Sequence, residues 1–205
     1  MKHKYLSLVM VAAPLLAAPS LVHADCFAES TPWTVRVGVH NIDPTGGSSQ
    51  TAAGDVEVKS KIGPTLNLDY RICRNITIDI LGAIPFTHDI KLNGQEVGTT
   101  RHLPPTVTLQ YHPLPDASFD PFVGAGVNRT FFFNESLSNG PNLQLSNTWG
   151  YTVQGGVDWK FAPAWVAGVD VRYIQIEPDA SVGGTPIGKV KIDPLAYGIN
   201  VGYRF

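Results

Sequence analysis

The sequence has little of several features that mark common protein classes. Only two cysteines, Cys26 and Cys73, occur in 205 residues. After the first 24 residues, no segment has the long uncharged apolar run that a membrane-spanning helix needs. The formal net charge of −2 gives no electrostatic basis for binding nucleic acid. These absences leave a membrane β-barrel open, because alternating strands hide their apolar residues from averaged hydropathy.

The first residues have the layout of a secretory signal peptide. Lys2 and Lys4 precede an apolar stretch that two prolines interrupt, and the small-residue site "VHA" ends at Ala24. We therefore expect cleavage after Ala24, with residues 1–24 as signal peptide and residues 25–205 as the mature domain. A transmembrane anchor is the alternative, and the short stretch with its processing site argues against it.

Alternation of apolar and polar residues is the strongest signal in the remaining chain. In "WTVRVGVH", Trp33 and Val35 share one face of a strand, whereas Thr34 and Arg36 share the other. Similar segments of about ten residues match the length that a tilted strand needs to cross a bilayer. The eight segments are 33–40, 62–71, 75–84, 103–112, 121–128, 149–160, 165–176 and 195–205.

The connectors between these segments alternate between long and short. We therefore predict an all-β fold, an eight-stranded antiparallel transmembrane β-barrel with long extracellular loops and short periplasmic turns. A soluble sandwich or lipocalin-like barrel would instead turn its apolar face inward. Aromatic residues at strand ends on the apolar face favour the membrane form. They are Trp33, Tyr70, Tyr111, Trp149, Trp159, Trp165, Tyr173, Tyr203 and Phe205.

Charged residues on the opposite face are predicted to lie inside the periplasmic half of the barrel. An eight-stranded barrel has room for side chains or one slim ligand. Buried charges need partners, so we expect an ion-paired plug that holds the strands in register. A polar conduit is the alternative. The plug residues are Arg36, Asp69, Arg71, Asp158, Lys160 and Arg204.

Toward the extracellular half, the inward face is predicted to become apolar. We interpret this face as a funnel that binds small hydrophobic molecules, although ordinary lumen packing is an alternative role for Leu81. The funnel residues are Leu81, Phe86, Phe131, Ile174 and Ile176.

Three prolines lie close to the ends of the third and fourth segments. Pro85, Pro104 and Pro105 cannot donate a ladder hydrogen bond, so they are expected to weaken local strand pairing. The hypothesis is that a hydrophobic solute enters the funnel, meets the plug, and leaves sideways through this opening into the lipid.

The two cysteines are both expected at the periplasmic end. Cys26 precedes the first strand, and Cys73 lies in the turn between the second and third strands. A disulfide between them is possible in an exported protein, and two free thiols are the alternative.

Catalysis and metal binding have no support in the residue pattern. Hydrolysis needs a nucleophile with a base in reach, whereas the histidines are scattered and three of the serines share one loop. We expect no enzyme activity, no cofactor and no metal. A structural, adhesion or receptor role acting through the loops is the alternative function, although these loops are expected to lack a long strand-extending pattern.

Five stretches resemble the outer membrane protein W family, which includes the alkane-uptake porins. They are "HLPPTVTLQYH" (102–112), "PFVGAGVNRTFFF" (121–133), "TWGYTVQGGVDW" (148–159), "DVRYIQI" (170–176) and "IDPLAYGINVGYRF" (192–205).

The resemblance implies an eight-stranded barrel in the bacterial outer membrane, associated with passive uptake of small hydrophobic compounds. It also implies that the barrel-assembly machinery reads the terminal aromatic, Phe205, during insertion. The expected partners are small hydrophobic molecules, outer-membrane lipid and that machinery, with the protein a monomer. Arg172 is a departure, because family members can carry an inward aromatic there.

Overall fold

The computed structural model describes residues 26, 32–45, 49–51, 54–83, 86–92, 95–137 and 143–205. Side chains are described for residues 26, 32–45, 59–82, 104–132 and 144–205. Throughout these ranges the regular secondary structure is β-strand. The described part has no helix long and apolar enough to span a membrane. The predicted signal peptide and Pro85 lie outside the described residues, as does the side chain of Phe86.

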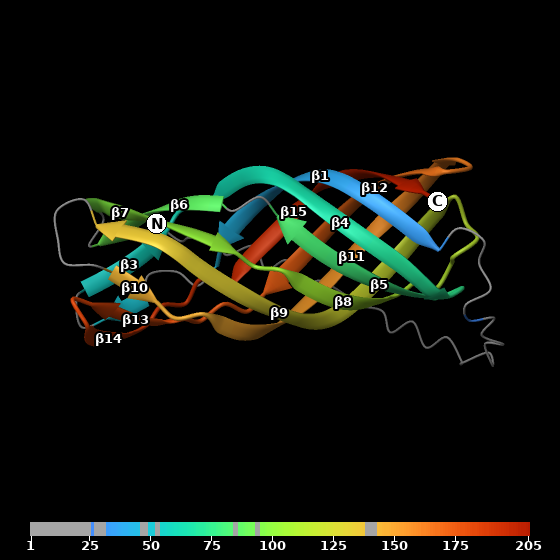
Figure 1. Cartoon of the computed structure of the whole chain (residues 1–205). Helices are drawn as coiled ribbons and strands as arrows, with labels where there is room; N and C mark the ends of the chain where they lie inside the picture. The colour runs from blue at the N-terminus through green and yellow to red at the C-terminus, as the bar shows by residue number, and fades with distance from the viewer. Residues whose placement is uncertain are drawn as a thin grey trace, which may run out of the picture.

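Eight antiparallel strands close into a barrel, which confirms the predicted fold (Figure 1). Around the wall the order follows the chain, and the last strand returns to the first. The barrel strands are β1 (Trp33–Pro44), β4 (Lys61–Cys73), β5 (Ile76–Ala83), β8 (Thr106–Tyr111), β9 (Phe119–Leu137), β11 (Thr148–Ala162), β12 (Trp165–Ile174) and β15 (Pro194–Arg204).

The first and last strands form the closing seam of the barrel. β1 pairs with β15 from Thr34↔Arg204 to Pro44↔Pro194. Beyond this ladder, the Trp33 amide donates to the Phe205 carbonyl at 3.2 Å, and the Phe205 amide donates to the Trp33 carbonyl at 2.9 Å. The C-terminal residue is therefore held in the wall, and at this seam β1 and β15 leave no open edge to the lipid.

The alternation seen in the sequence sorts the side chains into two environments. Val37 and Ile199 on the outer surface are 61% and 65% exposed, whereas Thr106 and Thr108 on the inner surface are 0% and 1% exposed. The apolar face therefore points outward and the polar face inward, the reverse of a soluble β-barrel.

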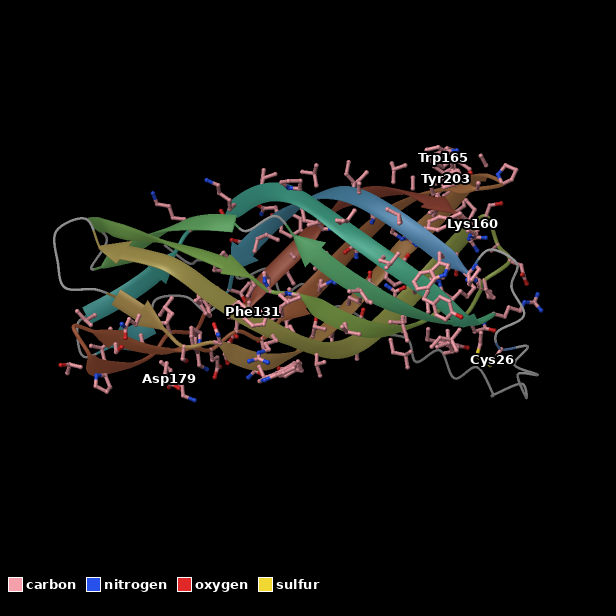
Figure 2. All side chains as sticks on the ribbon, viewed as in Figure 1. Cys26, Phe131, Lys160, Trp165, Asp179 and Tyr203 are labelled. Carbon is pink, nitrogen blue, oxygen red and sulfur yellow. A yellow bond between two sulfur atoms is a disulfide. The ribbon has the colours of Figure 1, made fainter. Side chains whose placement is uncertain are left out.

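Aromatic pairs ring the end of the barrel that carries the short turns. Trp33 packs on Tyr70 with ring centroids 4.6 Å apart, and Trp165 packs on Tyr203 at 5.1 Å. Figure 2 shows Trp165 and Tyr203 at the same end of the barrel as Cys26. Amphipathic rings in this position match the interfacial girdle of a membrane barrel, here at its periplasmic end.

The opposite end is built from further strands, which corrects the expectation that the loops lack a long strand-extending pattern. β9 runs on to Leu137 and pairs with β7 beyond the barrel, with Leu103 opposite Phe131. The sequence pattern missed this because alternation arises only where one face of a strand meets lipid or a core. The added strands are β2 (Ser49–Thr51), β3 (Gly54–Val58), β6 (Phe86–Leu92), β7 (Gln95–Leu103), β10 (Leu143–Leu145), β13 (Asp179–Val182) and β14 (Thr185–Lys189).

A disulfide joins Cys26 to Cys73, with their Cα atoms 4.0 Å apart. It ties the segment before β1 to the end of β4, at the short-turn end of the barrel. A cross-link between residues 47 positions apart restricts the unfolded chain more than the folded one.

Replacing both cysteines by serine is expected to lower the free energy of unfolding by about 2–4 kcal/mol, because the unfolded chain regains entropy. The measurement is the urea midpoint of the refolded protein in lipid vesicles, with non-reducing mass spectrometry of the exported wild type to verify the bond. Equal midpoints for the two proteins would contradict a stabilising role.

Candidate functional site

The centre of the lumen is occupied by an ion-paired cluster around Arg36 of β1. Its Nε donates to Asp69 Oδ2 at 2.5 Å, while Nη1 and Nη2 donate to the two carboxylate oxygens of Asp158 at 2.8 and 2.7 Å. Nη1 also reaches Asn200 Oδ1 at 3.2 Å. Arg36, Asp69 and Asp158 are each at most 9% exposed. Bidentate pairing of this kind is among the strongest that side chains make, so it links β1, β4 and β11 across the interior.

A second ion pair crosses the lumen nearer the extracellular side. Arg172 Nη2 of β12 donates to Asp79 Oδ1 of β5 at 2.9 Å. β5 and β12 lie on opposite sides of the barrel, four strands apart in either direction. Asp79 also accepts hydrogen bonds from Asn67 at 2.5 Å and Thr108 at 3.0 Å. This pair therefore forms a polar bar across the whole width of the lumen.

His40 adds a third polar contact beside this bar. Its Nδ1 lies 2.7 Å from Thr65 Oγ1, and its Nε2 lies 3.0 Å from Asp170 Oδ1. Asp170 accepts a further hydrogen bond from Asn200 Nδ2 at 3.0 Å, which joins His40 to the Arg36 cluster.

No group of three His, Cys, Asp or Glu side chains suited to a metal ion occurs among the described residues.

Lys160, predicted to join the central plug, belongs to a separate cluster nearer the periplasm. Its Nζ lies 2.9 Å from Asp120 Oδ2, and His112 Nδ1 lies 3.1 Å from the same oxygen. The side chain of Asp120 is fully buried. Sequence reasoning missed Asp120 because it stands at the start of β9, before the part of that strand where the alternation is readable.

The other two predicted plug residues, Arg71 and Arg204, lie at the periplasmic mouth. They line one small pocket there together with Arg36 and Asp69. Arg71 Nη1 also donates to the Arg74 carbonyl at 3.0 Å. The predicted plug is therefore a stack of charged layers rather than one cluster.

Inward-facing glycines make room for these side chains. A Cβ on Gly168 would come within 2.8 Å of Asp158 Oδ1 and 2.9 Å of Asn200 Oδ1. A Cβ on Gly198 would approach the His40 ring to 2.7 Å. In so narrow a barrel, the Gly-rich strands are what allow the polar layers to fit.

Above the polar layers lies a small cavity with mainly apolar walls. Its floor is formed by His40, Thr65, Asp170 and Arg172, and its volume is about 20 Å³. This space suits one water molecule and is far smaller than a hydrocarbon solute. The walls are Ile42, Leu81, Pro104, Ile174, Pro194 and Ala196.

Two predicted funnel residues are packed into a hydrophobic cluster that covers this cavity. Ile174 is 2% exposed and Ile176 is 0% exposed, and both pack with Phe132. The other buried members come from the segment around β13 and β14 and from the chain leading to β15, namely Ala180, Val190 and Ile192. The upper lumen is thus apolar, and in this structure its side chains fill it.

The predicted position of Phe131 in the funnel is wrong. Odd-numbered residues of β9, such as Val123 and Val127, face outward, and this alternation continues through Phe131. The ring of Phe131 lies 5.1 Å from the Arg129 guanidinium, which also lies 5.2 Å from the Trp149 ring on the outer surface. The inward aromatic is the next residue, Phe132, which is 9% exposed.

Strand pairing is interrupted beside the cavity, near the predicted prolines. Among the described residues, the β5–β8 ladder ends at Leu81↔Thr106, and the β6–β7 ladder begins at Phe86↔His102. On the other side of the prolines, Arg129 of β9 still donates to the Pro105 carbonyl at 3.1 Å. Among the described residues, the interruption therefore lies on the side of Pro104 and Pro105 that faces β5 and β6, whereas the side that faces β9 keeps a backbone hydrogen bond.

Replacing Arg36 by methionine is expected to destabilise the barrel by about 3–5 kcal/mol, because it leaves two buried carboxylates without their cation. The triple variant Arg36→Met, Asp69→Asn, Asp158→Asn is the control and is expected to recover part of this loss. The measurement is the urea midpoint in lipid vesicles. An unchanged midpoint for the single variant would show that the cluster does not stabilise the fold.

Comparison with known proteins shows which barrels this chain is similar to. The profile of the OmpW family matches residues 30–205. Outer membrane protein W of Vibrio cholerae is 32% identical over 223 residues, which cover 100% of each chain. The crystal structure of the outer membrane protein OprG from Pseudomonas aeruginosa superposes with a TM-score of 0.78 at 27% identity, covering 86% of this chain and 97% of that one.

A further relative is the dibenzothiophene metabolism operon protein PahQ of Pseudomonas aeruginosa. It is 26% identical over 192 residues, covering 87% of this chain and 91% of PahQ. The family match spans all eight barrel strands and the charged layers inside them. This chain therefore belongs to the OmpW family and is an eight-stranded β-barrel protein of the bacterial outer membrane.

Proposed function

We propose that this barrel mediates passive uptake of small hydrophobic molecules, which enter its apolar extracellular half and leave sideways into the bilayer. The observation that carries the proposal is the vertical division of the lumen. Apolar walls at Leu81 and Ile174 stand directly above the ion pair between Arg172 and Asp79. Transfer of an apolar solute from water to this level lowers its free energy. The solute cannot pass further through the charged layers without breaking buried ion pairs.

The interrupted ladder supports a lateral exit. Leu81 and Pro104 line the cavity, and among the described residues the pairing of β5 with β8 stops at Leu81↔Thr106. Where fewer backbone hydrogen bonds join two strands, the wall separates more easily than along a continuous ladder. We therefore propose the opening beside Pro104 and Pro105, on the side that faces β5 and β6. Pro85, the third proline of the prediction, lies outside the described residues.

Entry from outside requires movement of the hydrophobic cluster that covers the cavity. That cluster joins Ile174 and Ile176 to the segment around β13 and β14, which forms a small sheet with β10, separate from the barrel wall. Displacing this segment would open the apolar half of the lumen without touching the barrel ladders. The name of the relative PahQ, which ties that protein to a dibenzothiophene metabolism operon, is consistent with a hydrophobic solute.

Adhesion or reception through the extracellular strands is the second candidate function. It is favoured by the strand extension beyond the barrel, where β9 pairs with β7 and β7 pairs with β6. A variant that lacks residues 90–98, the outer ends of β6 and β7, separates the two functions. Loss of surface binding with uptake retained would favour adhesion.

The role of Phe205 in assembly is part of the same proposal. Its side chain is 53% exposed and continues the lipid-facing row of β15, and its backbone is paired with Trp33. A recognition element for the assembly machinery has to be accessible at a strand end, and this position meets that condition. The proposed solute pathway does not involve Phe205.

Replacing Leu81 by aspartate is expected to reduce hydrocarbon uptake roughly tenfold or more, because a carboxylate in the cavity wall removes the apolar environment of the solute. Uptake of radiolabelled hydrocarbon by cells is the measurement, and surface levels and heat-modifiable folding are checked in parallel. Leu81→Met conserves volume and polarity, so it serves as the matched control and is expected to behave like wild type. Wild-type uptake by a correctly folded Leu81→Asp variant would overturn the proposed path.

A further inference from the structure

One terminal nitrogen of the Arg172 guanidinium, Nη1, makes no hydrogen bond to the described residues. Nη2 is paired with Asp79, but no acceptor among the described residues hydrogen-bonds to Nη1, although the whole residue is 4% exposed. A buried donor on a charged group without an acceptor is costly, and such groups in folded proteins call for an explanation. The sequence marks the same residue as a departure from its family.

Arg172 borders the cavity below the apolar cluster. It contributes to the floor, while Leu81, Ile174 and Ala196 contribute to the walls. A ligand that displaces the hydrophobic cluster and extends down to this floor would therefore meet apolar surface over most of its length and polar groups only at its lower end. Few polar groups in an otherwise apolar pocket fix the orientation and the identity of a ligand.

The surrounding charges decide which polar end group fits. At the floor of the cavity, the carboxylate of Asp79 pairs with Arg172 and that of Asp170 pairs with His40. An anionic end group would be buried next to these two carboxylates, and a cationic one would compete for space with Arg172. An uncharged oxygen acceptor meets neither objection.

We propose that the ligand of this cavity is an uncharged amphiphile, a hydrophobic chain or ring that ends in one hydrogen-bond acceptor such as a ketone, ester or alcohol oxygen. The chain packs against Leu81 and Ile174, and the oxygen accepts a hydrogen bond from Arg172 Nη1. This inference rests on the proposed uptake function and narrows its substrate class from hydrocarbons in general to neutral oxygen-bearing ones.

The test uses the wild-type protein in lipid nanodiscs and radiolabelled probes of equal chain length, namely 2-decanone, decane, decanoate and decylamine at neutral pH. Binding is the excess of probe in protein-loaded nanodiscs over empty nanodiscs of the same lipid, which corrects for partition into the bilayer. Decanone is expected to bind roughly ten- to a hundredfold more tightly than decane, as a hydrogen bond from a charged donor implies. Decanoate and decylamine are expected to bind more weakly than decanone.

Two variants test whether Arg172 is the donor. Asp79→Asn keeps the donor and retains an acceptor for Thr108, so it is expected to keep the preference for decanone. Adding Arg172→Met to that variant removes the donor without leaving a buried unpaired carboxylate at position 79, and it is expected to bind decanone and decane about equally. The electrophoretic mobility of unheated samples, compared with heated ones, checks that both variants are folded.

The outcomes separate this inference from the function on which it rests. If the wild type binds all four probes equally, or if decanoate binds best, the inference is overturned while hydrophobic uptake stands. Persistence of the decanone preference in the double variant would also overturn the role of Arg172. If the wild type binds no probe beyond the lipid, both the inference and the proposed uptake function are overturned.

Discussion

Hydrogen bonding of the backbone inside a bilayer is the constraint on which this structure depends. A strand in lipid has no water to satisfy its amide and carbonyl groups, so the sheet has to close on itself. Closure is completed at the β1–β15 seam, where even the last residue, Phe205, is paired with Trp33. Once the wall is closed, alternation places every second side chain inside a lumen only eight strands wide. The interior chemistry of this protein follows from that enforced inward placement.

Buried charges in so narrow a space are tolerated because they meet across it. Arg36 joins three strands through Asp69 and Asp158, and Arg172 reaches Asp79 on the opposite wall. The same contacts close the axial route, because a solute would have to separate buried ion pairs. Stability and the block to axial passage thus come from the same side chains. In the proposed uptake function, the apolar upper lumen and the interrupted β5–β8 ladder favour the side wall as the exit, because that route disturbs the fewest ion pairs.

The number of barrel strands and the inward or outward direction of most side chains could be predicted from the sequence, because the alternation of apolar and polar residues records which side of a strand meets lipid. Arg36, Asp69 and Asp158 could be placed inside for the same reason. Their partners could not be predicted, since contacts across the lumen depend on strand stagger; Lys160 consequently pairs with Asp120 rather than with the central cluster. Phe131 was misassigned because three consecutive phenylalanines carry no alternation. The extracellular strands were missed because β7 and the end of β9 pair through their backbones, and their sequences lack the alternation that marks the barrel strands.

The lateral route is tested most directly by closing the wall reversibly. Gly82→Cys and Pro105→Cys, in a Cys26→Ser, Cys73→Ser background, place thiols next to the last β5–β8 pair, Leu81↔Thr106, on the lipid-facing side. A short thiol-cleavable bifunctional reagent then links them, and hydrocarbon uptake by cells is measured before linking, after linking and after reduction. The account predicts that uptake falls severalfold on linking and recovers on reduction. Uptake that is unchanged by a complete cross-link would contradict it.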